Sequence, residues 1–165
     1  MKKIRLTFLF LFVAFTLTTQ AQNMSSSYTT GLGIKMWGDG AGITLKHFAS
    51  SNTAFEGIGY FWRGGTRITG LYEIHFDIAN AAGLKWYIGP GAHVGFYNNR
   101  YNDKPYYNDW SSGSYVGLDG VIGLDYKFNG VPLNLSVDWQ PSFEFGDNRG
   151  FIGIWGGLGI RYTFN

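Results

Sequence analysis

Cysteine is absent from this chain of 165 residues, proline occurs only four times, and only 15% of the residues are charged. The absence of cysteine excludes a disulfide framework and every thiolate metal site. The charged fraction is well below the roughly 25% that is usual for soluble proteins. Long apolar runs are also missing, and a mean hydropathy of −0.08 argues against a protein that crosses membranes with helices. A single domain is expected for this length.

The first residues have the pattern of a secretory signal peptide. Lys2, Lys3 and Arg5 form a positive segment, residues 7–18 form a short apolar segment, and Ala21 stands at a small-residue cleavage position. The apolar segment is shorter than the ~20 residues that a membrane-spanning helix needs. We therefore expect residues 1–21 to be a signal peptide and residues 22–165 to be one exported domain.

Removal of that segment changes the net charge. It leaves ten Lys and Arg residues against eleven Asp and Glu residues, so the formal charge falls from +2 to −1. No basic patch then remains, and we expect no nucleic-acid partner.

The abundant residues are glycine, with 25 copies, and the aromatics, which make up 19% of the chain. From residue 29 onward, apolar side chains stand at every second position, which is the period of a β-strand. Clusters of Gly, Asn, Asp or Ser separate these stretches and predict turns. Pro90 predicts a bulge or kink in its strand. The alternation predicts eight strands, over residues 29–37, 41–48, 53–62, 67–78, 84–97, 115–128, 132–145 and 151–164.

The two faces of these strands indicate which side of the sheet lies inside the barrel. One face is uniformly bulky and apolar, whereas the other carries glycines and charges of both signs. Because an ionised side chain in lipid is costly, we expect the apolar face outside and the charged face inside a closed barrel. The near balance of signs predicts an interior filled by ion pairs. The expected interior network consists of Lys35, Lys46, Glu56, Arg67, Glu73, His75, Asp77, Lys85, His93, Asp119, Asp125, Lys127, Asp138, Glu144 and Arg161.

Residues 151–164 form the most regular of these stretches and end on Phe164, one residue before the terminus. A closing strand that ends in an aromatic, after a signal peptide and alternating strands, resembles the small eight-stranded outer-membrane barrels of the OmpA/OmpX type. Asn165 is a small departure, because that family usually ends on the aromatic itself. The resemblance implies an all-β, closed, antiparallel, up-and-down transmembrane barrel in a Gram-negative outer membrane. It also implies a monomer that contacts outer-membrane lipid and is recognised by the barrel-assembly machinery through its C-terminal strand.

An even number of strands places both termini in the periplasm and the long connection, residues 98–114, outside the cell. Its candidate recognition side chains are Arg100, Tyr101, Tyr106, Tyr107 and Trp110, since Tyr, Trp and Arg are frequent binding anchors. The alternative is a lid or an extended aromatic girdle over the barrel mouth. Neither reading identifies an extracellular ligand.

The chain shows no motif of an enzyme. His93, Ser142, Glu144 and Asp119 all fall on the inward face, but no local pattern sets a catalytic geometry. His47, His75 and His93 lie on different strands without the spacing of metal ligands, so neither a metal nor a cofactor is expected. We therefore expect a non-enzymatic barrel with a closed lumen and a structural, adhesive or surface-interaction role. The alternatives are a narrow pore, a lipid-modifying barrel enzyme or a soluble periplasmic ligand-binding barrel.

Overall fold

The computed structural model describes residues 28–38, 40–97, 114–145 and 150–164. Within these ranges the chain is entirely β-structure and turns. The strands are β1 (Thr30–Trp37), β2 (Gly40–Phe48), β3 (Thr53–Trp62), β4 (Gly65–Asp77), β5 (Leu84–Tyr97), β6 (Ser114–Lys127), β7 (Leu133–Trp139), β8 (Ser142–Phe145), β9 (Phe151–Ile152) and β10 (Gly156–Phe164). The part of the chain that the structure describes contains no helix long and apolar enough to cross a membrane.

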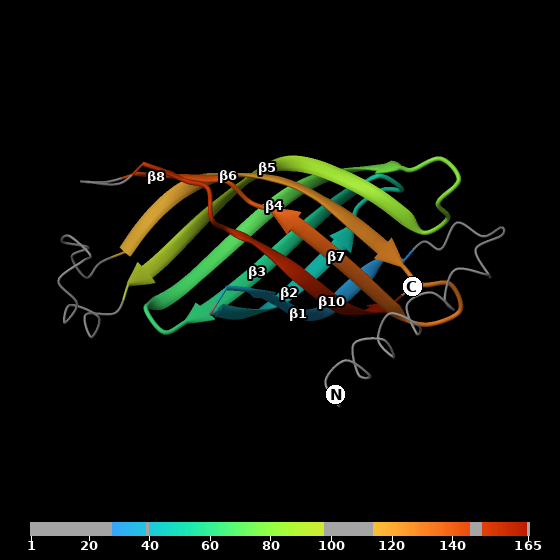
Figure 1. Ribbon diagram of the computed structural model, residues 1–165, viewed down its shortest axis with the longest axis horizontal. Helices are drawn as coiled ribbons and strands as arrows, with labels where there is room; N and C mark the ends of the chain where they lie inside the picture. Colours follow the sequence, from blue (N-terminus) through green and yellow to red (C-terminus); the bar gives the residue numbers. More distant parts are fainter. Residues whose placement is uncertain (1–27, 39, 98–113, 146–149, 165) are drawn as a thin grey trace, which may run out of the picture.

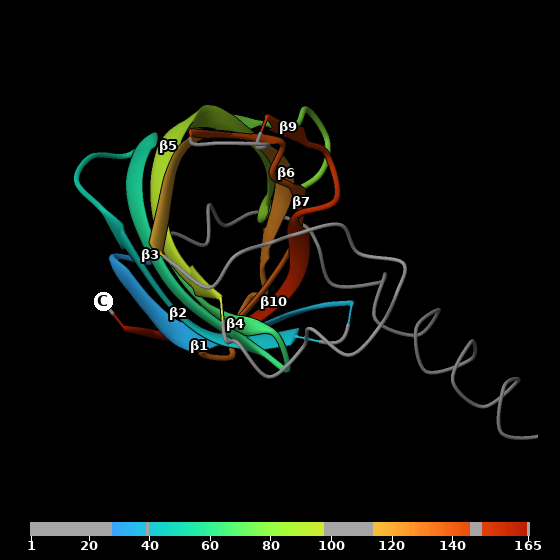
Figure 2. The same ribbon diagram turned by 90° about the vertical axis from the view of Figure 1, so that its left-hand side faces the viewer.

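The strands form one antiparallel sheet that closes on itself (Figures 1 and 2). Consecutive strands pair from β1 to β6, and β10 pairs with β1 on one side and with β7 on the other. Strands β7 and β8 both pair with β6 and continue one line, and β9 and β10 continue another. The result is a closed, up-and-down barrel of eight strands, as the alternation predicted.

The turns of the barrel follow local backbone chemistry. Gly38, Gly83 and Gly130 adopt positive φ angles of 57°, 81° and 73°, a region that glycine enters at little cost. Asn80, at φ 64°, is the only other described residue in that region, and asparagine tolerates it better than most side chains. Short turns of this kind join antiparallel neighbours and keep each strand beside the next one.

Alternation sorts the side chains between the two surfaces of the barrel. On β2, Ile43 and Leu45 are exposed outward, whereas Thr44 and Lys46 are fully buried inside. Glu56 on β3 is buried as well, so the inward register predicted for that strand is correct. The large exposed hydrophobic side chains are spread over all the longer strands, and several of their rings pack in outward pairs such as Phe76–Trp86 and Tyr162–Phe164.

The ladder is irregular near two prolines, Pro90 and Pro141, and only the irregularity at Pro90 was predicted. At Pro90, the pairing of β4 with β5 stops after Leu71↔Gly91 and resumes at Ile74↔Ile88 in the same register, so the predicted bulge is absent there. Pro lacks the N–H that this ladder needs, but it adds no residue. A true one-residue shift lies opposite Pro141: Trp139 faces Gly156, whereas Ser142 faces Ile152. The extra residue stands between β9 and β10.

Several inward glycines leave room for a large side chain on the neighbouring strand. Gly123 is the direct partner of Tyr87, and a β-carbon there would lie 2.7 Å from the Tyr87 ring. Gly95 stands in the same relation to Tyr115. Because a narrow barrel cannot hold bulky side chains at every inward position, these glycines let the interior fill without overlap.

Candidate functional site

The charged interior is the candidate site, because charged side chains are rarely fully buried unless they are paired. Inward positions of the strands hold most of the predicted network. Fully or almost fully buried are Lys35, Lys46, Glu56, Arg67, Glu73, His75, His93, Asp119, Asp125, Asp138, Glu144 and Arg161. The physical cause is the two-residue period of the strands, which turns each of these side chains away from the apolar outer face.

Glu56 is the centre of the first ion-pair group. Its carboxylate lies 2.5 Å from Nη2 of Arg161, 3.3 Å from Nζ of Lys35 and 3.2 Å from Nζ of Lys46. The Thr44 hydroxyl also donates to it, at 2.6 Å. These groups come from β1, β2, β3 and β10, so a single carboxylate ties together the strands on both sides of the seam between the first and the last strand.

The same group extends to three further carboxylates. Asp138 receives Nζ of Lys35 at 2.5 Å and the Tyr87 hydroxyl at 2.6 Å. Lys46 lies 2.8 Å from Glu73 and 3.4 Å from Asp125. Each of these carboxylates therefore has a cation within ion-pair distance, which offsets the cost of removing its charge from water. The other partners at the edge of the group are His75, beside Glu73 at 2.9 Å, and the Asn134 amide, which donates to Asp125 at 2.7 Å.

A second group occupies the end of the barrel where β5 ends and β6 begins. Asp119 is contacted by Nη2 of Arg67 and, at 2.9 Å, by Nδ1 of His93. The opposite ring nitrogen of His93 lies 3.8 Å from Glu144. The Arg67 guanidinium also lies over the Trp155 ring, 4.4 Å from its centroid. This group is smaller than the first, and its cation is anchored both by charge and by an aromatic face.

Three residues of the predicted interior set lie instead at the rim of the barrel. Asp77 ends β4 with 84% of its side chain exposed and pairs with Lys85 at 3.3 Å. Lys127 ends β6, and its ammonium donates to the carbonyls of Phe128 and Val131. Their alternation phase is the inward one, but they stand where the strands leave the barrel, so water reaches them. The prediction that they belong to the interior network is therefore wrong for these three.

His93 and Ser142 do not form a nucleophile–base pair. The hydrogen bonds of the described residues join His93 to Asp119, whereas the Ser142 hydroxyl donates to the Ile152 carbonyl at 3.5 Å. His47 is on the outer surface and bonds to Thr30. Within the described ranges, His, Asp and Glu side chains form no group of three or more that is suited to a metal ion.

The predicted interior network omits several residues that the structure places inside the barrel. Tyr28 precedes β1 and its hydroxyl reaches Asp125, while Gln140 donates to Asp138 at 2.8 Å. Leu71 and Val121 are buried inside although they are apolar. The available signal was the alternation phase, because Leu71 stands two residues from Glu73 and Val121 stands two from Asp119.

Other predictions fall outside the described residues. The signal peptide, residues 1–21, is one of them. The others are the candidate recognition side chains Arg100, Tyr101, Tyr106, Tyr107 and Trp110. Both remain predictions.

Comparison with models of protein families finds no match, and comparison with curated proteins finds none either. Among solved structures, the chain is similar to the N-terminal β-barrel domain of Pseudomonas aeruginosa OprF. The superposition has a TM-score of 0.58 at 16% sequence identity and covers 82% of this chain and 94% of that domain. Together with the closed barrel of eight antiparallel strands, this likeness shows that the chain has the fold of the small outer-membrane β-barrels of the OmpA type.

Proposed function

We propose that this protein is a monomeric, non-enzymatic barrel, integral to the outer membrane. Its lumen is lined by paired charges and is closed, and its role is structural, adhesive or in surface interaction. Its outer surface would contact lipid, and the barrel-assembly machinery would recognise its C-terminal strand, which ends on Phe164. The proposal includes neither a cofactor nor a metal ion.

One observation carries the proposal, namely the reversed polarity of the molecule. Leu118 and Ile43 are 58% and 59% exposed on the outside, whereas Arg161 and Lys46 are 0% exposed inside. A soluble ligand-binding barrel needs the opposite arrangement, with its apolar side chains lining the cavity and its charges in water. An apolar exterior around a closed hydrogen-bonded sheet matches what a hydrocarbon environment requires of a spanning β-structure.

The test is fractionation of cells that produce the full chain. We expect the protein to stay with the outer membrane after carbonate and high-salt washing, because apolar contact with lipid does not depend on salt. We also expect the unheated protein to migrate faster than the boiled protein on a detergent gel. Release of the protein into the soluble fraction by either wash would contradict the proposal and would favour the soluble carrier.

The surface role has a separate test within residues 98–113. Replacing Tyr101, Tyr106, Tyr107 and Trp110 together by serine should reduce the attachment of cells to surfaces and leave the heat-dependent gel migration unchanged. Unchanged attachment would restrict the proposal to a structural role. The matched control is the outward pair Phe143→Ser and Phe145→Ser, which removes aromatic rings from the barrel wall instead.

A further inference from the structure

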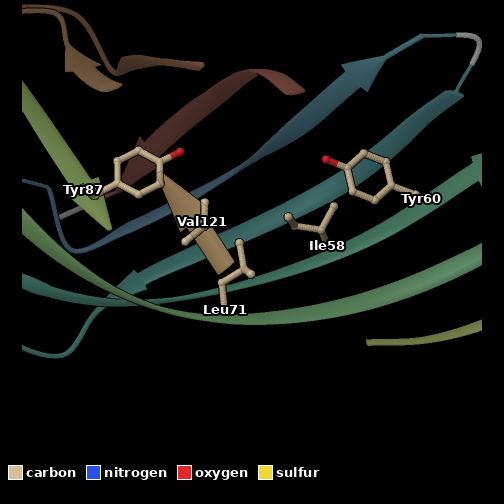
Figure 3. Packing of buried hydrophobic residues seen from close by; sticks show 5 residues of the cluster. All are labelled: Ile58, Tyr60, Leu71, Tyr87 and Val121. Carbon is tan, nitrogen blue, oxygen red and sulfur yellow. The ribbon is translucent and has the colours of Figure 1, made fainter. Parts of the chain in front are cut away.

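The interior also contains an apolar cluster that the charge-paired description does not use. Ile58, Tyr60, Leu71, Tyr87 and Val121 are buried together, and Trp62 and Trp155 pack against them. In Figure 3 the five buried side chains of the cluster project from β3, β4, β5 and β6 into the same interior space. Apolar side chains at inward positions are unexpected in a barrel whose other inward side chains are mostly charged or very small.

The cluster separates the two ion-pair groups along the strands. On β4, Leu71 stands between Arg67 of one group and Glu73 of the other. On β6, Val121 stands between Asp119 and Asp125 in the same way. Inward side chains on a strand follow each other at every second residue, so these positions set the order along the barrel. The interior is therefore layered: a charged group, a mainly apolar layer that also holds the Gln140 amide on the line of β7 and β8, and a second charged group.

The polar atoms within this layer already have partners. The Tyr87 hydroxyl donates to Asp138 at 2.6 Å, and the Tyr60 hydroxyl donates to the Gly156 carbonyl at 2.9 Å. In Figure 3 the hydroxyl of each tyrosine lies at the end of the ring that faces the other tyrosine. Ile58, Leu71 and Val121 thus present hydrocarbon, whereas the Tyr87 ring borders the first charged group, with Nζ of Lys46 4.2 Å from its centroid.

We propose that Ile58, Leu71 and Val121, together with the ring of Tyr60, form the barrier that stops ions from crossing the barrel. An ion in a charged layer can replace a salt-bridge partner and keep its electrostatic stabilisation. In the apolar layer it would lose its water shell and find only the uncharged amide oxygen of Gln140 as a ligand, which is the more costly step. The ion pairs hold the barrel wall together, and the apolar layer closes the path.

This inference rests on the proposed membrane location and closed lumen. Its experiment distinguishes a failure of the apolar barrier from a failure of the closed lumen. The purified full chain is reconstituted into planar lipid bilayers and its conductance is measured in potassium chloride. The test variant is Ile58→Thr/Leu71→Asn/Val121→Thr, which makes the layer polar. Thr matches Val in size, whereas Thr and Asn are smaller than Ile and Leu. The matched control, Ile68→Thr/Leu118→Asn/Val116→Thr, makes the same exchanges at outward positions of β4 and β6. Leu71→Asn alone is the variant to use if the triple variant does not reach the heat-modifiable folded state.

We expect the wild type and the outward control to be silent, and the interior variant to raise the conductance by about tenfold or more. Arg67→Gln/Asp119→Asn, which removes the ion pair of the smaller group, should remain silent because the apolar layer is intact. A silent, folded interior variant would overturn the barrier and leave the closed lumen standing. A conductance that appears on removal of the ion pair would likewise overturn it. A wild type that conducts would overturn the closed lumen itself.

Discussion

At the scale of single residues, the barrel interior depends on buried charges that lie within ion-pair distance of each other. Glu56 shows this most clearly, because three cations from three other strands contact its carboxylate. A buried charge with partners is tolerable, whereas removing one partner leaves the others uncompensated. Neutralising Glu56 would therefore leave Lys35, Lys46 and Arg161 close together, with less negative charge between them.

Glu56→Gln should lower the free energy of unfolding by about 3–5 kcal/mol, the range measured when one partner of a buried ion pair is removed. The measurement is urea unfolding of the protein in lipid vesicles, followed by tryptophan fluorescence. Asp77→Asn is the matched control, because Asp77 also pairs with a lysine but is 84% exposed. Its loss should stay below about 1 kcal/mol, since exposed pairs contribute little. Equal losses for the two variants would contradict the interior network.

Alternation alone predicted the direction of nearly every one of these side chains. The two-residue period specifies the face of the strand on which a residue lies, and Arg161 and Glu73 are inside as expected. The period does not state how far along the barrel a residue lies. Asp77, Lys85 and Lys127 share the inward phase but stand at the rim, and only the paired strand ends reveal this. The same limit applies to the apolar layer: the phase places Leu71 and Val121 inside, but it does not state that they lie between the two charged groups.

At the scale of strands, the irregular segment between β9 and β10 poses the main problem for a barrel in lipid. Outside a regular ladder, a backbone carbonyl needs another donor. Here the carbonyls of Gly153 and Ile154 accept from the indole nitrogens of Trp139 and Trp37, the first at 2.7 Å. The carbonyl of Trp155 accepts from the backbone of Gln140 at 2.8 Å. Two indole side chains and one backbone N–H thus replace the missing ladder.

Trp139→Phe should lower the free energy of unfolding by about 1–2 kcal/mol, because it leaves a carbonyl without its donor while keeping an aromatic ring. Hydrogen exchange should rise near residues 152–157 and remain unchanged in β3 and β4. The matched control is Trp86→Phe, which changes an exposed tryptophan that stacks on Phe76 at 4.4 Å. An equal rise in exchange for the control would show that loss of the larger ring, and not the hydrogen bond, is responsible.

At the scale of the whole molecule, closure brings the two ends of the described chain together. Leu32 of β1 is the direct partner of Tyr162 of β10. Direct partners in antiparallel strands have Cα atoms about 4.5–5.5 Å apart, which is within the range that a disulfide can span. Because the chain has no cysteine of its own, a disulfide can form only between the two cysteines that are introduced.

Leu32→Cys/Tyr162→Cys should therefore form an intramolecular disulfide in the folded barrel, detected as a change in gel migration without reducing agent. Leu32→Cys/Val116→Cys is the matched control, because Val116 is also outward and apolar but lies on β6, which does not pair with β1. The control should not crosslink. A failure of the first pair to crosslink in folded protein would contradict closure through β1 and β10.

The sequence by itself determined the number of strands, their approximate bounds and the face to which each side chain turns. These properties are local, because the two-residue period and the turn residues act within a single strand or hairpin. The tertiary structure alone decided which charge meets which, where the rim begins and where the apolar layer lies. Those depend on how far each strand is displaced along its neighbours when the sheet closes, and the alternation within one strand does not contain that displacement.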